Sequence, residues 1–131
     1  MAAKKRAARE QSRDPAFDRL VRALNGLGAA ALVRKAFAAE AVLSRFAPVP
    51  RGDRAPAPEQ TITGQDAIAR WLAQTPPGTT FLLDPKAAKG AGLSCAYLIR
   101  HGDFENGGTW TLTLADDGRI ATLEHRPWSL A

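Results

Sequence analysis

Cysteine, histidine and tyrosine are all scarce in this chain of 131 residues. Cys95 is the only cysteine, which excludes an internal disulfide and a four-cysteine zinc site. With two histidines and this one cysteine, no metal-ligand spacing is present, so we expect neither a metal nor another cofactor. A single unpaired cysteine is typical of a reducing compartment, and the sequence therefore predicts a cytoplasmic protein.

Long hydrophobic runs are also missing. The longest apolar stretch without a charge covers residues 27–33, which is far too short to cross a bilayer. The basic amino-terminal segment is not followed by a hydrophobic one, so we expect no secretory signal and no membrane association. The apolar share of 45% and the charged share of 24% are ordinary for one globular domain with a single core.

The net charge of +5 lies mostly at the amino terminus, because residues 1–14 hold five Lys or Arg against two acids. We expect residues 1–13 to form a basic, flexible tail and residues 14–131 to form a single domain. Nucleic-acid binding requires a basic stripe with stacking aromatic side chains. The sequence contains no such stripe, and a nucleic-acid partner is not expected.

Apolar spacing predicts three helices. The first covers residues 14–25, where apolar side chains recur at i, i+3, i+4 and i+7. The second covers about residues 28–38. The third follows Thr63, which together with Asp66 resembles a capping box with Asp in place of the usual Glu.

Alternating apolar residues predict strands. Residues 40–46 form the first, and the four prolines of residues 47–60 make that segment a loop unable to join a sheet interior. From residue 79 onward the alternation predicts four antiparallel strands. Asp117-Gly118 predicts a two-residue hairpin turn with positive φ at both positions. The preceding turn is closed by His101-Gly102 or by Asn106-Gly107, with a bulge at the other.

The order of these elements resembles that of the nuclear-transport-factor-2-like superfamily. Five segments carry the resemblance: Phe37–Val42, Gly64–Ile68, Trp71-Leu72, Gly108–Leu112 and Asp116–Ile120. The chain is most similar to the SnoaL-like branch, whose members resemble polyketide cyclases, over roughly residues 14–128. The resemblance implies an α+β fold, in which a cone-shaped, curved antiparallel sheet wraps around three helices and encloses an internal pocket.

Such pockets host cofactor-free proton-transfer chemistry in some members, whereas other members only bind or dimerise. Ketosteroid-isomerase-like members carry an aspartate that acts as the base where this chain has Arg45, and a tyrosine on the first helix, where this chain has Phe17. Epoxide-hydrolase-like members need an Asp two residues after an Arg, but Arg100 is followed at that spacing by Gly102. Neither chemistry is therefore expected.

His125 is the best candidate for an acid–base residue. Dehydratase-like members use two pocket histidines, which matches this chain only in number. Strand alternation places His125 and Glu124 on opposite faces and favours His125 pointing inward. Asp103 or Glu105 would be the second proton carrier, as in the acid-dependent SnoaL-like cyclases. The alternative is a hydrogen-bonded structural histidine.

Aromatic residues are the candidates for contact with a small, largely apolar organic ligand, although core packing would equally explain most of them. They are Tyr97, Trp110, Trp71, Trp128 and Phe17. Tyr97 would supply a hydrogen-bond donor. Two interpretations remain: a SnoaL-like enzyme with cofactor-free cyclase, isomerase or dehydratase chemistry, or a non-catalytic binding module that forms a homodimer through its sheet face.

Overall fold

The computed structural model describes residues 14–83 and 93–129, so the predicted amino-terminal tail lies outside the described residues. Within these residues the chain forms three helices, α2 (Ala16–Asn25), α3 (Ala30–Ala36) and α4 (Gln65–Leu72). The strands are β1 (Phe37–Phe46), β2 (Pro58–Thr63), β3 (Thr80–Leu83), β4 (Ser94–His101), β5 (Phe104–Leu114) and β6 (Ile120–Pro127). No helix in the described ranges combines the length and apolarity that crossing a bilayer requires.

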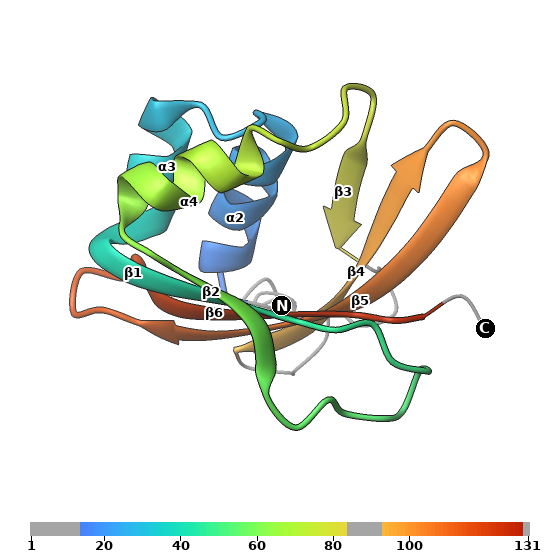
Figure 1. Cartoon of the computed structure of the whole chain (residues 1–131). Helices are drawn as coiled ribbons and strands as arrows, with labels where there is room; N and C mark the ends of the chain where they lie inside the picture. The colour runs from blue at the N-terminus through green and yellow to red at the C-terminus, as the bar shows by residue number, and fades with distance from the viewer. Residues whose placement is uncertain (1–13, 84–92, 130–131) are drawn as a thin grey trace, which may run out of the picture.

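The six strands form one open sheet in the order β2-β1-β6-β5-β4-β3. The sheet bends so strongly that β3, β4 and β5 rise on the same side as the helices (Figure 1). All neighbouring strands run antiparallel except β1 and β6, which pair in parallel, so the sheet is mixed. The predicted α+β cone is confirmed, with this one parallel pairing as the refinement.

The core lies between the helices and the concave face of the sheet. Phe17 of α2 and Phe37 of β1 are both 0% exposed there, as is Trp110 of β5. The backbone N–H of Ala16 donates to Asp14 Oδ1 over 2.9 Å, so the Asp14 carboxylate binds the amino terminus of α2. This contact fixes where α2 enters the core.

The second helix is shorter than predicted, and the first strand is longer. The chain turns with positive φ at Leu27 and Gly28, and α3 begins only at Ala30. A Cβ at Gly28 would lie 2.3 Å from the carbonyl oxygen of Ala69, so the turn packs directly against α4. The chain passes from α3 into β1 at Phe37, because these residues pair with β6 rather than continue the helix.

The loop prediction for residues 47–60 was wrong at its end, where β2 begins at Pro58. β2 is an edge strand, so its proline costs no hydrogen bond inside the sheet. The predicted capping box is also wrong. Thr63 belongs to β2, and α4 is preceded by Gly64 with φ of 93° and no side-chain cap.

The turn between β4 and β5 lies at Gly102, which has a φ of 59°. Pairing continues in register from His101 with Phe104 onward, so the alternative turn or bulge at Asn106-Gly107 does not form. The hairpin between β5 and β6 has positive φ at Gly118 only, and the two-residue turn predicted with positive φ at Asp117 is therefore wrong. The carbonyl of Ala115 accepts the N–H of Gly118. After Thr113 the pairing shifts by one residue, because β6 has one residue more than β5 at this point.

Candidate functional site

A pocket of about 450 Å³ opens on the concave side of the sheet, where β1, β6 and the β4–β5 hairpin meet. The side chains that set its chemistry are Arg45, Tyr97, Ile99, Phe104, Asn106 and His125. Among the described residues that line it, none is an Asp or a Glu. The pocket therefore combines hydrogen-bond donors with apolar walls.

Strand pairing brings these groups together. His125 in β6 lies opposite Arg45 in β1 and opposite Trp110 in β5. Tyr97 in β4 pairs with Gly108 in β5, two positions from Trp110 along the same face. His125 points inward, as the alternation of β6 predicted.

Trp110, His125 and Tyr97 form a directed chain of hydrogen bonds. The indole N–H of Trp110 donates to His125 Nδ1 over 2.9 Å. Indole cannot accept, so Nδ1 carries no hydrogen, and a neutral imidazole then carries its hydrogen on Nε2. His125 Nε2 lies 3.2 Å from the Tyr97 oxygen and donates to it. The hydroxyl hydrogen of Tyr97 is thereby left for another acceptor.

Packing between aromatic rings holds the three hydrogen-bonded side chains in place. The Tyr97 ring stacks on Trp110 with centroids 4.3 Å apart, and on His125 with centroids 5.2 Å apart. Trp71 of α4 approaches the His125 ring edge-on at 6.2 Å. Gly108 is required beneath the tyrosine, because a Cβ there would lie 2.6 Å from the hydroxyl oxygen. The three side chains therefore have little freedom to change partners.

The surroundings keep both titratable members uncharged at neutral pH. Burial, with a smaller contribution from the Arg45 charge, lowers the pKa of His125 to about 4. Burial also raises the pKa of Tyr97 far above its usual value, against an opposing effect of the Arg45 guanidinium. His125 is thus a neutral acceptor and donor, and Tyr97 is a protonated donor.

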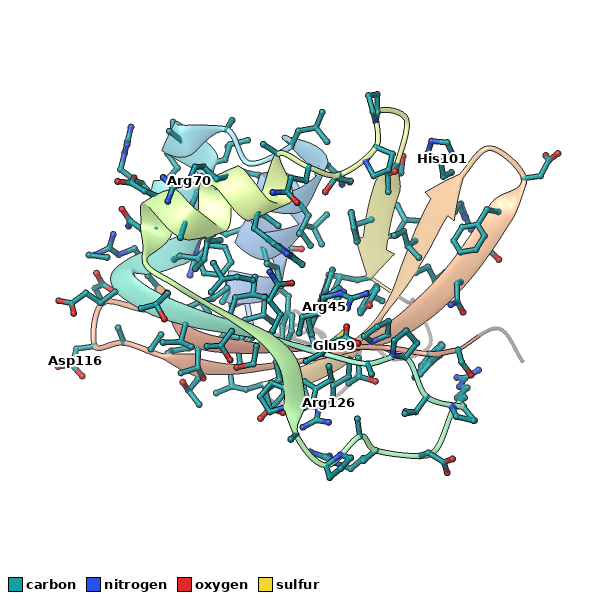
Figure 2. All side chains as sticks on the ribbon, in the orientation of Figure 1. Arg45, Glu59, Arg70, His101, Asp116 and Arg126 are labelled. Atoms are coloured by element: carbon teal, nitrogen blue, oxygen red, sulfur yellow. The ribbon has the colours of Figure 1, made fainter. Side chains whose placement is uncertain are left out.

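Arg45 supplies the only cationic side chain among the described residues that line this pocket. It forms an ion pair with Glu59 of β2, and Figure 2 shows the two side chains side by side on the concave side. One of its guanidinium nitrogens binds the carboxylate, and the others remain available as donors. From the sequence, Arg45 was considered only as the residue that replaces the base of ketosteroid-isomerase-like proteins, although its alternation with Ala41 and Leu43 pointed to the inner face.

The predicted acids lie at the end of the β4–β5 hairpin. Asp103 occupies the turn, and Glu105 binds Arg100 over 2.5 Å; both acids are exposed. Since β5 alternates, Asn106 rather than Glu105 shares the inner face with His125. The structure does not bring either acid to His125, and their catalytic role stays a prediction.

The remaining predicted residues occupy different depths. Tyr97 and Trp128 line the pocket, and Trp71 approaches the His125 ring from the side of helix α4. Trp110 and Phe17 are 0% exposed and belong to the core, although Trp110 acts on the site through His125. Asn106, whose side-chain amide donates to the carbonyl of Trp128 over 2.7 Å at the pocket wall, was not predicted from the sequence as a site residue.

The two other candidate side chains lie away from the pocket floor. His101 is exposed near the hairpin end, where Nε2 donates to the carbonyl of Pro77 over 3.0 Å (Figure 2). Glu124 lies on the outer face and binds Arg126 over 3.2 Å. The outward direction of Glu124 agrees with the strand alternation.

Comparison with known proteins gives matches only at the level of structure: no protein-family model and no curated protein sequence matches the chain. A protein from Agrobacterium tumefaciens, named as an isomerase of the SnoaL-like family, is similar with a TM-score of 0.65 and 22% identity. The match covers 87% of this chain and 95% of that one.

Two further solved structures agree with it. An NTF2-like protein of unknown function from Mesorhizobium loti has a TM-score of 0.61 and 18% identity, over 90% of this chain and 99% of that chain. A protein from Jannaschia sp. CCS1, named as a SnoaL-like polyketide cyclase, has a TM-score of 0.60 and 9% identity, over 86% and 84%. The chain therefore has the nuclear-transport-factor-2-like fold that its sequence resembles, in the form seen in SnoaL-like proteins.

Proposed function

We propose that this protein binds a small, largely apolar organic molecule through a carbonyl or similar acceptor oxygen. The observation that carries the proposal is the hydrogen-bond chain from Trp110 through His125 to Tyr97. It leaves the Tyr97 hydroxyl hydrogen without an acceptor among the described residues, at the wall of an open pocket. An acceptor oxygen on a ligand would satisfy that hydrogen.

The same series of hydrogen bonds makes the Tyr97 hydroxyl a good hydrogen-bond donor. Hydrogen bonds in series polarise one another, so a tyrosine that accepts from His125 donates more strongly than an isolated one. The free N–H groups of Arg45 offer a second contact for the same oxygen or for a neighbouring one. The apolar walls formed by Ile99 and Phe104 suit the rest of an organic ligand.

We favour binding over proton-transfer catalysis. A base near neutral pH is needed to remove a proton from carbon. Both nitrogens of His125 are engaged, and its pKa of about 4 makes it a weak base. Catalysis that uses His125 with Asp103 or Glu105 remains a separate prediction, and exchange of ketone α-protons with deuterated solvent would detect it.

Calorimetric titration with a panel of polycyclic and open-chain ketones tests the proposal. We expect Tyr97→Phe to weaken binding between about twofold and tenfold, the worth of one hydrogen bond between uncharged partners. Thr113→Val is the matched control. It also removes a hydroxyl that bonds across strands, to Thr122 over 2.6 Å, but on the exposed outer face.

Two results would count against the proposal. One is a wild-type protein that binds no member of the panel. The other is a folded Tyr97→Phe variant, verified by circular dichroism, that binds every ketone as tightly as the wild type. An equal loss in Thr113→Val would show that the effect of the tyrosine substitution is not local.

A further inference from the structure

A second cavity of about 390 Å³ lies beside the first, between the segment that joins α4 to β3 and the end of the β4–β5 hairpin. Thr75, Pro76 and Thr79 form one side of it. Phe81 of β3 and His101 of β4 form part of the other. It faces the same concave side of the sheet, because these strand residues share the inner face.

Two residues belong to both cavities. Ile99 and Phe104 line the first cavity on one side and the second on the other. Along the inner face of β4, Tyr97, Ile99 and His101 follow at every second position, so the two cavities extend over roughly 13 Å of strand. A ligand that touches Tyr97 and passes over Ile99 enters the second cavity.

The two cavities differ in chemistry. The first carries Arg45, Tyr97 and Asn106, whereas the described lining of the second contains no Asp, Glu, Lys or Arg. Nε2 of His101, the histidine in its lining, already binds the carbonyl of Pro77. A hydrocarbon portion therefore fits the second cavity better than a polar group does.

Phe104 stands at the boundary between the cavities and is 44% exposed. Large exposed apolar side chains are uncommon, and the described residues include just one other, Leu27. A hydrocarbon chain lying across Ile99 would cover the Phe104 ring. The exposed ring is thus explained if a ligand occupies both cavities.

We infer that the ligand is an elongated amphipathic carbonyl compound, with its polar head at Tyr97 and Arg45 and its apolar body in the second cavity. This inference rests on the proposed function, since Tyr97 holds the head. It adds that the length of the ligand's hydrocarbon chain determines its affinity. Residues 75–79 and Phe104 would contact the additional methylene groups of a longer ligand.

Calorimetric titration with the methyl ketones butanone, octanone and dodecanone tests the inference. We expect wild-type affinity to rise by up to about fourfold for each methylene that becomes buried. Thr79→Trp, which fills the second cavity, is expected to abolish the gain for the long ketones and leave butanone binding unchanged. Thr75→Trp fills the same cavity from another position and serves if the first variant does not fold. Thr113→Trp adds the same ring on the outer face as a control.

The outcomes separate the two proposals. If the wild type binds all three ketones equally well, and Tyr97→Phe still weakens the binding of butanone, the inference of an elongated ligand is wrong. The proposed contact between Tyr97 and the ligand oxygen would then still stand. A chain-length gain that survives in both cavity-filling variants overturns the inference of an elongated ligand as well. A wild type that binds none of the ketones overturns the proposed function and the inference together.

Discussion

His125 illustrates how one residue can be placed correctly from sequence while its chemistry depends on its partners. The alternation of residues 120–126 was enough to point it inward. Its protonation state follows from the indole N–H of Trp110, fifteen positions away, which occupies Nδ1. No local pattern encodes that contact, because it arises only when β5 and β6 pair in this register.

The desolvated, neutral state of His125 predicts a pH-dependent stability. Its pKa is about 4 in the folded protein and 6.5 in the unfolded chain, so the unfolded chain binds the proton more tightly. Stability should be fully present above pH 6.5 and decline as the pH falls toward 4. The loss from this residue is expected to reach about 3 kcal/mol at most. Urea unfolding across this pH window measures it.

His125→Asn is the control for this effect. An asparagine amide oxygen can still accept the indole N–H of Trp110, but the side chain does not titrate. The difference in unfolding free energy between wild type and variant should therefore depend on pH within the window. A constant difference from pH 7 to 4.5 would contradict the proposed neutral, enclosed histidine.

At the scale of elements, Asn25 shows how a helix end can support an edge strand. Its side-chain amide donates to the carbonyl of Phe81 over 2.9 Å, and its oxygen accepts the Phe81 N–H over 2.7 Å. The side chain thus acts as a strand partner for β3, whose other edge pairs with β4. The helical pattern of residues 14–25 places Asn25 only at the end of the helix, because its strand partner lies 56 residues later.

Asn25→Ala is expected to destabilise the protein by about 1–3 kcal/mol, since it leaves the Phe81 backbone groups without partners in a partly buried position. Hydrogen exchange of the Phe81 amide should accelerate more than that of amides in β6. Thr113→Ala, an exposed substitution elsewhere in the sheet, is the comparison. Unchanged protection of Phe81 in Asn25→Ala would refute the pairing role.

The edge strand β2 is the element that sequence patterns missed. Its burial pattern has a single buried residue, Ile62, so the alternation that reveals other strands is absent. Four nearby prolines also favoured a loop. β2 exists because β1 offers it an open edge, as pairing from Val42 with Thr63 onward shows. Tertiary pairing overrides local propensity here.

At the scale of the whole molecule, the outer face of the sheet is partly covered by the loop between β1 and β2, opposite the helices (Figure 1). Arg126 holds the loop by donating to the carbonyl of Ala55 over 3.2 Å, and its guanidinium lies over the Phe46 ring at 3.6 Å. A smaller cavity of about 220 Å³ remains between this loop and strands β4, β5 and β6. The loop occupies surface that a sheet-to-sheet dimer would need.

We therefore expect a monomer at micromolar concentration, measured by light scattering after size-exclusion chromatography. The two large exposed apolar residues of the described chain, Leu27 and Phe104, do not lie on the outer face. The homodimer through the sheet face, which was expected from the sequence, is the opposing prediction. A dimer that Thr113→Arg, a charge on the outer face, converts to a monomer would support it and contradict our expectation.

The sequence by itself determined the succession of helices and strands apart from β2, the inward direction of His125 in β6 and, through its resemblance to a known family, the fold class. Helical and strand periodicity are local properties, so one chain segment is enough to reveal them. Only the tertiary structure decided the parallel pairing of β1 with β6, the edge strand β2, and the junction of Trp110, His125 and Tyr97. These depend on contacts between residues far apart in sequence, whose register is set by packing of the whole core.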